Sequence, residues 1–285
     1  MLNWQKRISK RLEEKWLSRI DFIEPERIVF SVTAPTGRSM ELLQIYDLSE
    51  SEAQRLQSCF GGTVRKLKPE SWFIAHGSEQ RPLRVRDSIL ILNSPEALAS
   101  CQREFPKRIG ICIPPGMAFG TGEHATTLTC LRFLADIAKT LQKSGKTWSH
   151  LDVGTGSGIL AIASKKLGAQ RVLALDNDPD SIRIAAENAA DNGVSGIRFD
   201  EADILAWNAA GQKFDLITAN LFSDLLIAAL PGLAKAMSDR CDLVISGILR
   251  EHGQECLQAA NSLGLKLQAV RRIGRWVTAW LTRNG

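Results

Sequence analysis

The sequence lacks an apolar run of the roughly 18 residues that a membrane span needs, and no continuous apolar segment follows its charged start. Its six cysteines contain no C-x-x-C pair and no metal-ligand spacing, so we expect reduced, packed thiols and no metal site. Internal repeats and low-complexity tracts are also missing. These absences argue against membrane, metal-ribbon and disulfide-stapled proteins, and they predict a soluble cytoplasmic protein.

Strong charge of either sign is missing too. The chain has 36 basic and 31 acidic residues, a net charge of +5, which suits an anionic partner such as a ribonucleoprotein without requiring one. Basic residues gather at both ends, and no acidic residue follows Glu255; we interpret them as solvated helix and strand positions. The first hundred residues contain no recognisable RNA-binding module, and direct DNA binding is not expected.

Glycines are concentrated after one expected strand. Gly154, Gly156 and Gly158 form a G-x-G-x-G turn between a buried strand and a helix, and a second apolar strand ends in Asp176. This layout places a small cofactor over the carboxyl ends of two parallel strands, with the aspartate accepting hydrogen bonds from ribose hydroxyls. The dinucleotide fingerprint needs a third glycine at the position of Ile159. The pattern therefore favours S-adenosylmethionine over NAD.

The second part of the chain alternates regularly between strand and helix patterns. Strands are expected at 148–153, 171–176, 197–200, 214–220, 241–247, 266–273 and 276–282, and helices at 157–167, 179–192, 223–238 and 250–263. This order predicts an α/β fold with a doubly wound, mostly parallel seven-stranded sheet that ends in an antiparallel hairpin. Such a hairpin is characteristic of class I methyltransferases and unusual in dinucleotide dehydrogenases.

The first part predicts a small α+β domain at 1–95, followed by a linker at 96–108 and the larger domain at 109–285. The expected elements are a basic helix at about 4–20, strands at 27–33, 40–46, 63–67 and 88–92, a helix opened by a capping box at Ser49, and a helix or linker beginning at Asn93-Ser94-Pro95.

Four motifs occur in order in the larger domain. They are Phe119-Gly120-Thr121-Gly122 with His124 and Thr126-Thr127, the run from Asp152 to Ala163, Ala219-Asn220-Leu221, and Ser246-Gly247-Ile248-Leu249. Over roughly 109–285 they resemble the ribosomal protein methyltransferase family PrmA. The resemblance implies methylation of amino groups on a large-subunit ribosomal protein. Glu123 and Ala125 depart from the family's usual Thr and Pro, and the front third, which grips the substrate in that family, matches poorly.

The cofactor-binding residues that we expect are Thr127, Gly154, Gly156, Gly158, Asp176, Asp203 and Asn220, and the expected catalytic residues are Asn220 and Phe222. Asp203 stands where this fold often bonds the adenine amine, and Thr127 lies against the cofactor in the family or caps the following helix. Asn220 would hold the attacking amine, with Phe222 as a wall. Asp152 would orient the glycine loop, reach the cofactor ammonium through water, or cap a helix, and His124 is a general base or a structural residue.

The predicted function is S-adenosylmethionine-dependent methylation of protein amino groups. Methyl transfer to a nucleic-acid amine, or to another protein target, is the main alternative. A nucleotide-dependent oxidoreductase and a non-enzymatic binding module that keeps the fold are the further alternatives.

Overall fold

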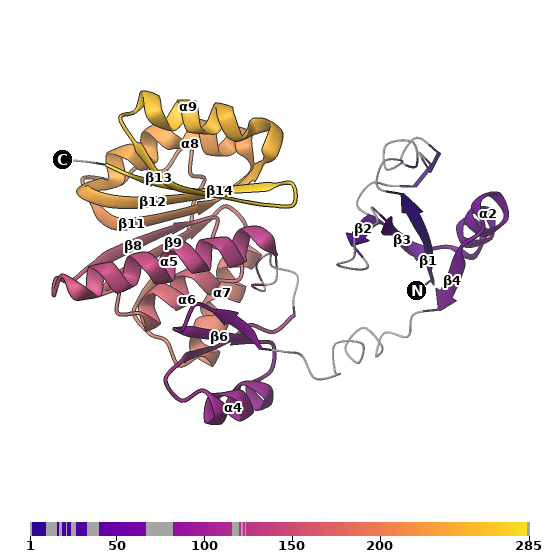
Figure 1. Ribbon diagram of the computed structural model, residues 1–285, viewed down its shortest axis with the longest axis horizontal. Coiled ribbons are helices and arrows are strands. Elements are labelled where there is room, and N and C mark those ends of the chain that lie inside the picture. The colour runs from indigo at the N-terminus through magenta and orange to yellow at the C-terminus, as the bar shows by residue number, and fades with distance from the viewer. Residues whose placement is uncertain are drawn as a thin grey trace. The chain divides into compact units, whose positions relative to one another are not determined.

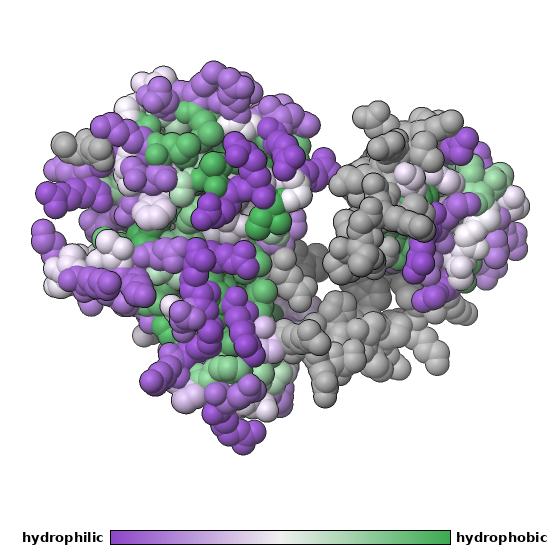
Figure 2. Space-filling view, in the orientation of Figure 1, coloured by the Kyte–Doolittle hydropathy of each residue, from purple (hydrophilic) through white to green (hydrophobic). Residues whose placement is uncertain are grey.

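The computed structural model describes residues 2–9, 16, 19–20, 22–23, 27–32, 40–66, 82–115, 120, 122 and 124–283. The chain forms two compact units, Met1–Gln80 and Arg81–Gly285. Figure 1 shows the sheet and helices of each unit, and Figure 2 shows that polar residues cover much of the visible face of the larger one, with smaller apolar areas between them. Among the described residues no helix is both long and apolar enough to cross a membrane.

The first unit is built on an antiparallel sheet with the order β2-β3-β1-β4. Its elements are β1 (Leu2–Ser9), β2 (Ile28–Val32), β3 (Met40–Leu48), α2 (Glu50–Phe60) and β4 (Thr63–Lys66). The prediction of a helix at about 4–20 is wrong for its first residues, which form β1. Trp4 and Ile8 are buried, and a spacing of four puts two side chains on one face of either a helix or a strand. Pairing of β1 with both β3 and β4 decides for the strand.

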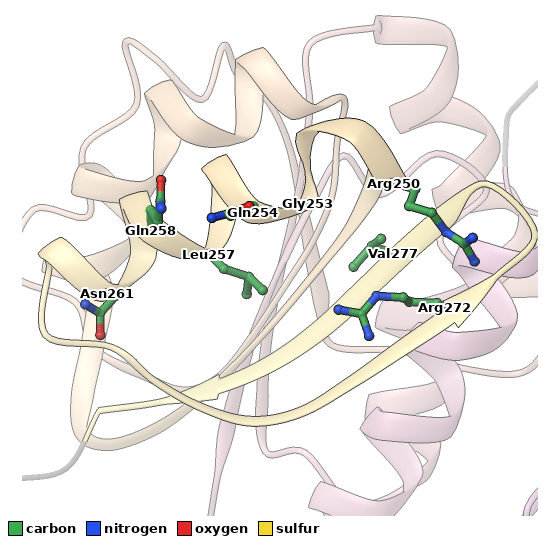
Figure 3. A pocket seen from close by; sticks show the side chains of 8 residues that line it. All are labelled: Arg250, Gly253, Gln254, Leu257, Gln258, Asn261, Arg272 and Val277. Atoms are coloured by element: carbon green, nitrogen blue, oxygen red, sulfur yellow. The ribbon is translucent and has the colours of Figure 1, made fainter.

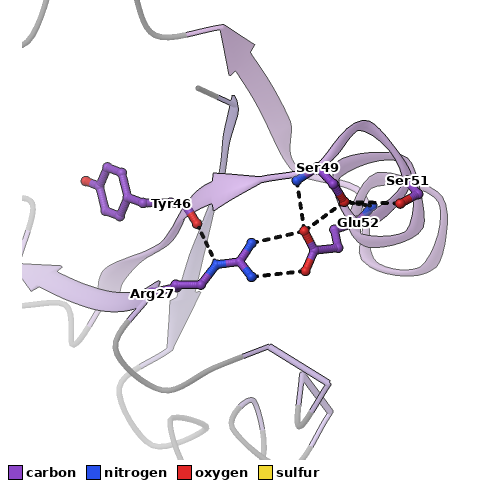
Figure 4. A network of polar contacts seen from close by, with 5 residues as sticks. All are labelled: Arg27, Tyr46, Ser49, Ser51 and Glu52. Atoms are coloured by element: carbon purple, nitrogen blue, oxygen red, sulfur yellow. Dashed lines mark hydrogen bonds and ion pairs between the residues drawn. The ribbon is translucent and has the colours of Figure 1, made fainter. Parts of the chain in front are cut away.

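Hydrogen bonds from Arg27 connect the start of α2 to β3, the strand that precedes this helix in the chain. Ser49 and Glu52 form the predicted capping box, in which Glu52 N donates to Ser49 Oγ (3.2 Å) and Ser49 N donates to Glu52 Oε2 (2.8 Å). The Arg27 guanidinium donates to both Glu52 oxygens at 3.1 and 3.0 Å and to the Tyr46 carbonyl at 3.1 Å (Figure 4). This bond from Arg27 is the main cause that holds the pKa of Glu52 at about 2.

The larger unit contains the predicted seven-stranded sheet, in the order β10-β9-β8-β11-β12-β14-β13. The strands are β8 (Ser149–Val153), β9 (Arg171–Asp176), β10 (Ile197–Glu201), β11 (Phe214–Asn220), β12 (Met237–Leu249), β13 (Lys266–Ile273) and β14 (Trp276–Thr282). The first five are parallel to one another, and β14 is antiparallel to both β12 and β13. The predicted doubly wound α/β fold class and its terminal hairpin are thereby confirmed.

Helices cover both faces of this sheet (Figure 1). One face packs on α5 (Ala125–Lys143), α6 (Ile159–Lys166) and α7 (Pro179–Asp191), and the other on α8 (Ser223–Ala236) and α9 (Gly253–Ser262), which follows the short 3-10 helix η3 (Arg250–His252). Because strand side chains alternate between faces, Leu151 and Val153 of β8 enter the core under α8 and α9. His150 and Asp152, at the positions between them, therefore face α5 and α6.

A three-stranded sheet adds to the larger unit. It comprises β5 (Leu83–Val85), β6 (Ile89–Leu92) and β7 (Ile109–Cys112), with α4 (Pro95–Glu104) between the last two. The Asn192 side chain joins β7 to the end of α7, because it accepts from Cys112 N (2.8 Å) and donates to Cys112 O (2.7 Å).

The predicted domain boundaries at 95 and 109 thus fall inside the larger unit. Parallel pairing of β6 with β7 makes them one sheet, and α4 occupies much of the expected linker. The strands expected at 63–67 and 88–92 correspond to β4 and β6, which belong to different units.

Candidate functional site

The glycine loop follows β8 and folds over the end of β9. Gly154 N and Thr155 N both donate to the Leu175 carbonyl, at 2.9 and 3.0 Å. The three glycines have φ of +69°, +52° and +80°, a region that residues with side chains rarely adopt. A Cβ at Gly158 would lie 2.9 Å from that of Ala185 on α7, so this glycine also permits close helix packing. These contacts place the backbone of the loop at the carboxyl edge of the sheet.

Asp176 ends β9 with a fixed carboxylate. Its Oδ2 accepts from Gly156 N at 2.9 Å and its Oδ1 accepts from Asp178 N at 3.2 Å. A carboxylate has about four lone-pair directions, so acceptor capacity remains for two hydroxyl groups. Asp178 is the N-cap of α7 and accepts from Asp180 N at 3.0 Å.

Asp203 lies just beyond β10, the edge strand that pairs with β9. Register pairs Glu201 with Asp176, and Ala202 N donates to the Asp176 carbonyl at 2.8 Å. Asp203 is exposed, and its Oδ1 accepts from Leu205 N at 2.9 Å. It therefore stands at the same carboxyl edge as Asp176, one strand further out.

A buried chain of polar groups supports the glycine loop from below. Asp152 accepts from the hydroxyls of Thr155 (2.7 Å) and Thr218 (2.5 Å). Thr218 Oγ1 is also 2.8 Å from His150 Nε2, whose Nδ1 is 2.8 Å from Ser164 Oγ. Burial raises the pKa of Asp152 to about 6 and lowers the pKa of His150 to about 3. The imidazole is therefore neutral at physiological pH.

This series of hydrogen bonds bears on the role of Asp152, for which the sequence left three alternatives. It also includes two residues, His150 and Thr218, that the sequence analysis did not identify. The bond between Asp152 and the Thr155 hydroxyl agrees with a role in orienting the loop. His150 and Thr218 were missed. The sequence signal for them was the presence of polar residues in strands that are otherwise apolar. His150 and Asp152 are two residues apart in β8, and Asp152 pairs with Thr218 of β11 in the strand register.

Thr127 lies in the first turn of α5 and is 2% exposed. The alternative that Thr127 caps the helix is wrong, because α5 begins at Ala125 and its N-cap is His124. Within the described residues the Thr127 hydroxyl has no hydrogen-bond partner. A buried hydroxyl without a partner is costly, so this atom fits a polar group of a ligand at the edge. Ser157 Oγ donates to the Gly120 carbonyl at 2.6 Å and brings the preceding loop to the glycine loop.

His124 is engaged in structure around this loop. Its Nδ1 lies 2.7 Å from Thr126 Oγ1, and its ring packs edge-on against Trp276, with centroids 5.1 Å apart. Burial lowers the pKa of His124. These contacts favour the structural interpretation over the general base. Phe119 and Glu123 lie outside the described residues.

Asn220 ends β11, the strand on the other side of β8. Within the described residues its amide makes no side-chain hydrogen bond, so its carbonyl can accept one. Leu221 N donates to the Ser246 carbonyl at 3.1 Å, and a Cβ at Gly247 would collide with the Leu221 backbone. Phe222 follows, 77% exposed, as the N-cap of α8.

The topology thus brings together the predicted residues of β8, β9 and β11, because the carboxyl ends of adjacent parallel strands meet at one edge. The carboxylate of Asp176 suits a ribose, the glycine loop suits close backbone approach, and the unpartnered Thr127 hydroxyl suits a further polar atom. These residues fit S-adenosylmethionine.

Comparison with known proteins gives a consistent result. The family model described as Ribosomal protein L11 methyltransferase (PrmA) matches residues 15–284. A ribosomal protein L11 methyltransferase of Symbiobacterium thermophilum is 33% identical over 258 residues, 89% of this chain and 80% of the relative. One of Geobacter metallireducens is 37% identical over 216 residues, 75% and 67% of the two chains.

Among solved structures, a ribosomal protein L11 methylase of Lactobacillus delbrueckii subsp. bulgaricus matches with a TM-score of 0.59 and 30% identity. The match covers 72% of this chain and all of that one. The prediction of family and cofactor from the sequence is confirmed. The chain belongs to the ribosomal protein L11 methyltransferase (PrmA) family, and its methyl donor is S-adenosylmethionine.

Proposed function

We propose that this protein transfers methyl groups to amino groups of a large-subunit ribosomal protein, at lysine side chains, the N-terminal amine or both. The observation that carries the proposal is the Asn220 amide at the strand end beside the glycine loop, which makes no side-chain hydrogen bond to the part of the chain that the structure describes. By their names, the relatives described above act on ribosomal protein L11. A ribosomal substrate would place the enzyme in the cytoplasm.

When bound, S-adenosylmethionine supplies a methyl group that is already activated, so the chain mainly provides positioning and desolvation. Asp176 would accept from the ribose hydroxyls, and Asp203 would accept from the adenine amine. Gly154, Gly156 and Gly158 would let the backbone lie against the methionine part, with the Thr127 hydroxyl as a further contact.

The chemistry at the substrate requires a neutral amine whose lone pair faces the methyl group. The Asn220 carbonyl would accept an N–H of this amine and so fix its direction. A free lysine has a pKa of about 10.4, and removal from water lowers it. The exposed ring of Phe222 provides an apolar wall that substrate binding would cover. No dedicated base is needed, since the amine can lose its proton to water before transfer.

The first unit, residues 1–80, is assigned to recognition of the protein substrate, and the larger unit to cofactor binding and transfer. Compact folding of each unit from its own core supports this division. The experiment must distinguish a large-subunit ribosomal protein from a different protein target.

The test is methyl transfer from S-adenosylmethionine with a labelled methyl group. Purified ribosomal protein L11 of the same organism and a total lysate serve as substrates, and the lysate is treated with protease or with RNase in parallel. Label on L11 that requires an intact Asn220 supports the proposal. Label on another protein corrects the target, and label that survives protease but not RNase overturns protein methylation.

A further inference from the structure

An open groove of about 580 Å³ lies between α9 and the β13–β14 hairpin (Figure 3). It is lined by Arg250, Gly253, Gln254, Leu257, Gln258, Asn261, Arg272 and Val277. None of these residues belongs to the cofactor site described above. The groove is therefore a separate feature of the larger unit.

Two unpaired arginines give the groove a positive charge. In Figure 3 the Arg272 guanidinium lies in the space between α9 and β13, and Arg250 lies beside the hairpin. Within the described residues neither forms an ion pair. Glu255, the last acidic residue of the chain, lies 3.7 Å from His252. A guanidinium without a carboxylate is a ready partner for an anionic group, which it can bind with two parallel hydrogen bonds.

The remaining lining suits a peptide. Gln254, Gln258 and Asn261 are spaced four and three residues apart, so their amides form a row on one side of α9. An amide side chain both donates and accepts, as a peptide group does. Leu257 and Val277 add apolar surface against which side-chain methylenes can pack. Among the described strands β13 is at the edge of the sheet and pairs on one side only, with β14.

The groove opens near the carboxyl edge that carries Asn220. Gly247 of β12 contacts the Leu221 backbone, and Arg250 follows three residues later, a distance of about 10 Å in extended chain. Leu249 pairs with Trp276, and Arg250 N donates to the Arg275 carbonyl at 2.8 Å, so the turn of the hairpin lies at this edge. A protein that presents an amine at Asn220 can therefore extend into the groove.

We propose that this groove binds an acidic, extended segment of the protein substrate, with Arg250 and Arg272 pairing its carboxylates. The inference rests on the proposed function for the identity of that substrate. A phosphate backbone would satisfy the arginines, but it would leave the apolar floor and the row of amides unused. An acidic peptide uses all three features.

The first measurement needs no catalysis. A fluorescent peptide of about ten glutamates is titrated with the full chain, with the Arg272→Glu variant and with Lys266→Glu. Lys266 is the matched control because it is exposed at the opposite end of the same strand. We expect Arg272→Glu to weaken binding by tenfold or more and Lys266→Glu by less than threefold. Equal binding by all three proteins overturns the proposal, as does tighter binding of a ribosomal RNA fragment that depends on Arg272.

The second measurement uses methyl transfer to L11. Arg272→Glu should raise the KM for L11 roughly tenfold with kcat and the KM for S-adenosylmethionine nearly unchanged, because the groove binds substrate away from the reacting atoms. Failure of the wild-type enzyme to methylate L11 refutes the proposed substrate, while the peptide titration still decides the groove. An Arg272→Glu enzyme with a normal KM for L11 would show that the groove does not bind the substrate, even if the wild-type protein binds the glutamate peptide there.

Discussion

Replacing His150 by valine should leave the stability of the protein nearly unchanged near pH 7.5 and make it more stable than the wild type near pH 5. His150 is fully buried between Ser164 and Thr218, and burial lowers its pKa to about 3. The unfolded chain binds a proton on this residue below pH 6.5, and the folded chain does not. A group whose pKa is depressed on folding costs stability as the pH falls below its unfolded pKa.

The size of the effect follows from this shift. One proton changes the free energy of unfolding by about 1.4 kcal/mol per pH unit, so the wild type loses about 2 kcal/mol between pH 6.5 and 5 through His150. Asp152, whose pKa of about 6 is raised by burial, has the opposite dependence, but both proteins retain it. The difference between the two proteins therefore isolates the histidine.

Near pH 7.5 the balance is close to zero. Valine loses two hydrogen bonds, worth about 1 kcal/mol each, and adds apolar burial of similar size. A neutral imidazole has a single N–H, so in the wild type one of the two hydroxyls donates to the ring. Without the ring, Thr218 can donate to Asp152 and Ser164 can donate to the Ala161 carbonyl at 2.9 Å, so no buried hydroxyl lacks an acceptor.

Urea unfolding followed by far-ultraviolet circular dichroism, at both pH values, measures the difference. The signal is dominated by the helices of the larger unit, where His150 lies. A difference in stability between valine variant and wild type that is the same at both pH values would refute a neutral, buried histidine.

Three further outcomes are expected. Asp176→Ala should weaken S-adenosylmethionine binding by about 1.5–3 kcal/mol in calorimetry, as for lost hydrogen bonds to a charged group, and unchanged affinity would remove it as the ribose acceptor. Asn220→Ala should lower kcat about 100-fold while affinity for S-adenosylmethionine falls less than in Asp176→Ala; normal turnover would contradict the positioning role. A fragment of residues 81–285 should fold and bind S-adenosylmethionine but methylate its protein substrate poorly, and full activity would show that residues 1–80 do not recognise the substrate.

The larger sheet could be predicted because its central strands are buried on both faces. Such strands appear as short apolar runs between helix patterns, and Gly274 between two extended segments marked the hairpin at its observed bounds. The first residues of the chain, which form β1, gave no comparable signal. The Trp4–Ile8 spacing fits helix and strand alike, and only pairing with strands more than thirty residues away distinguishes them.

The residues of the candidate site that lie at strand ends could be predicted from the sequence. Asp176 and Asn220 terminate recognisable strands, so topology alone places them at one edge. The start of α5 was not accessible, since His124 caps it through a ring nitrogen rather than through one of the usual capping side chains. The His150–Thr218 contact depends on strand register, which apolar patterns do not define for polar side chains.

The hydrogen bonds that Asn192 makes to β7 affect how such an enzyme can acquire a new target during evolution. Its side chain holds β7 by both backbone groups of Cys112, as a neighbouring strand would, and this anchor lies wholly inside the larger unit. Residues 1–80 can therefore be exchanged, by recombination or by design, without breaking the hydrogen bonds that fix the three-stranded sheet. Under the proposed division of roles, the boundary at residue 81 would make specificity modular, because a new recognition unit could be joined to the larger unit without changing it.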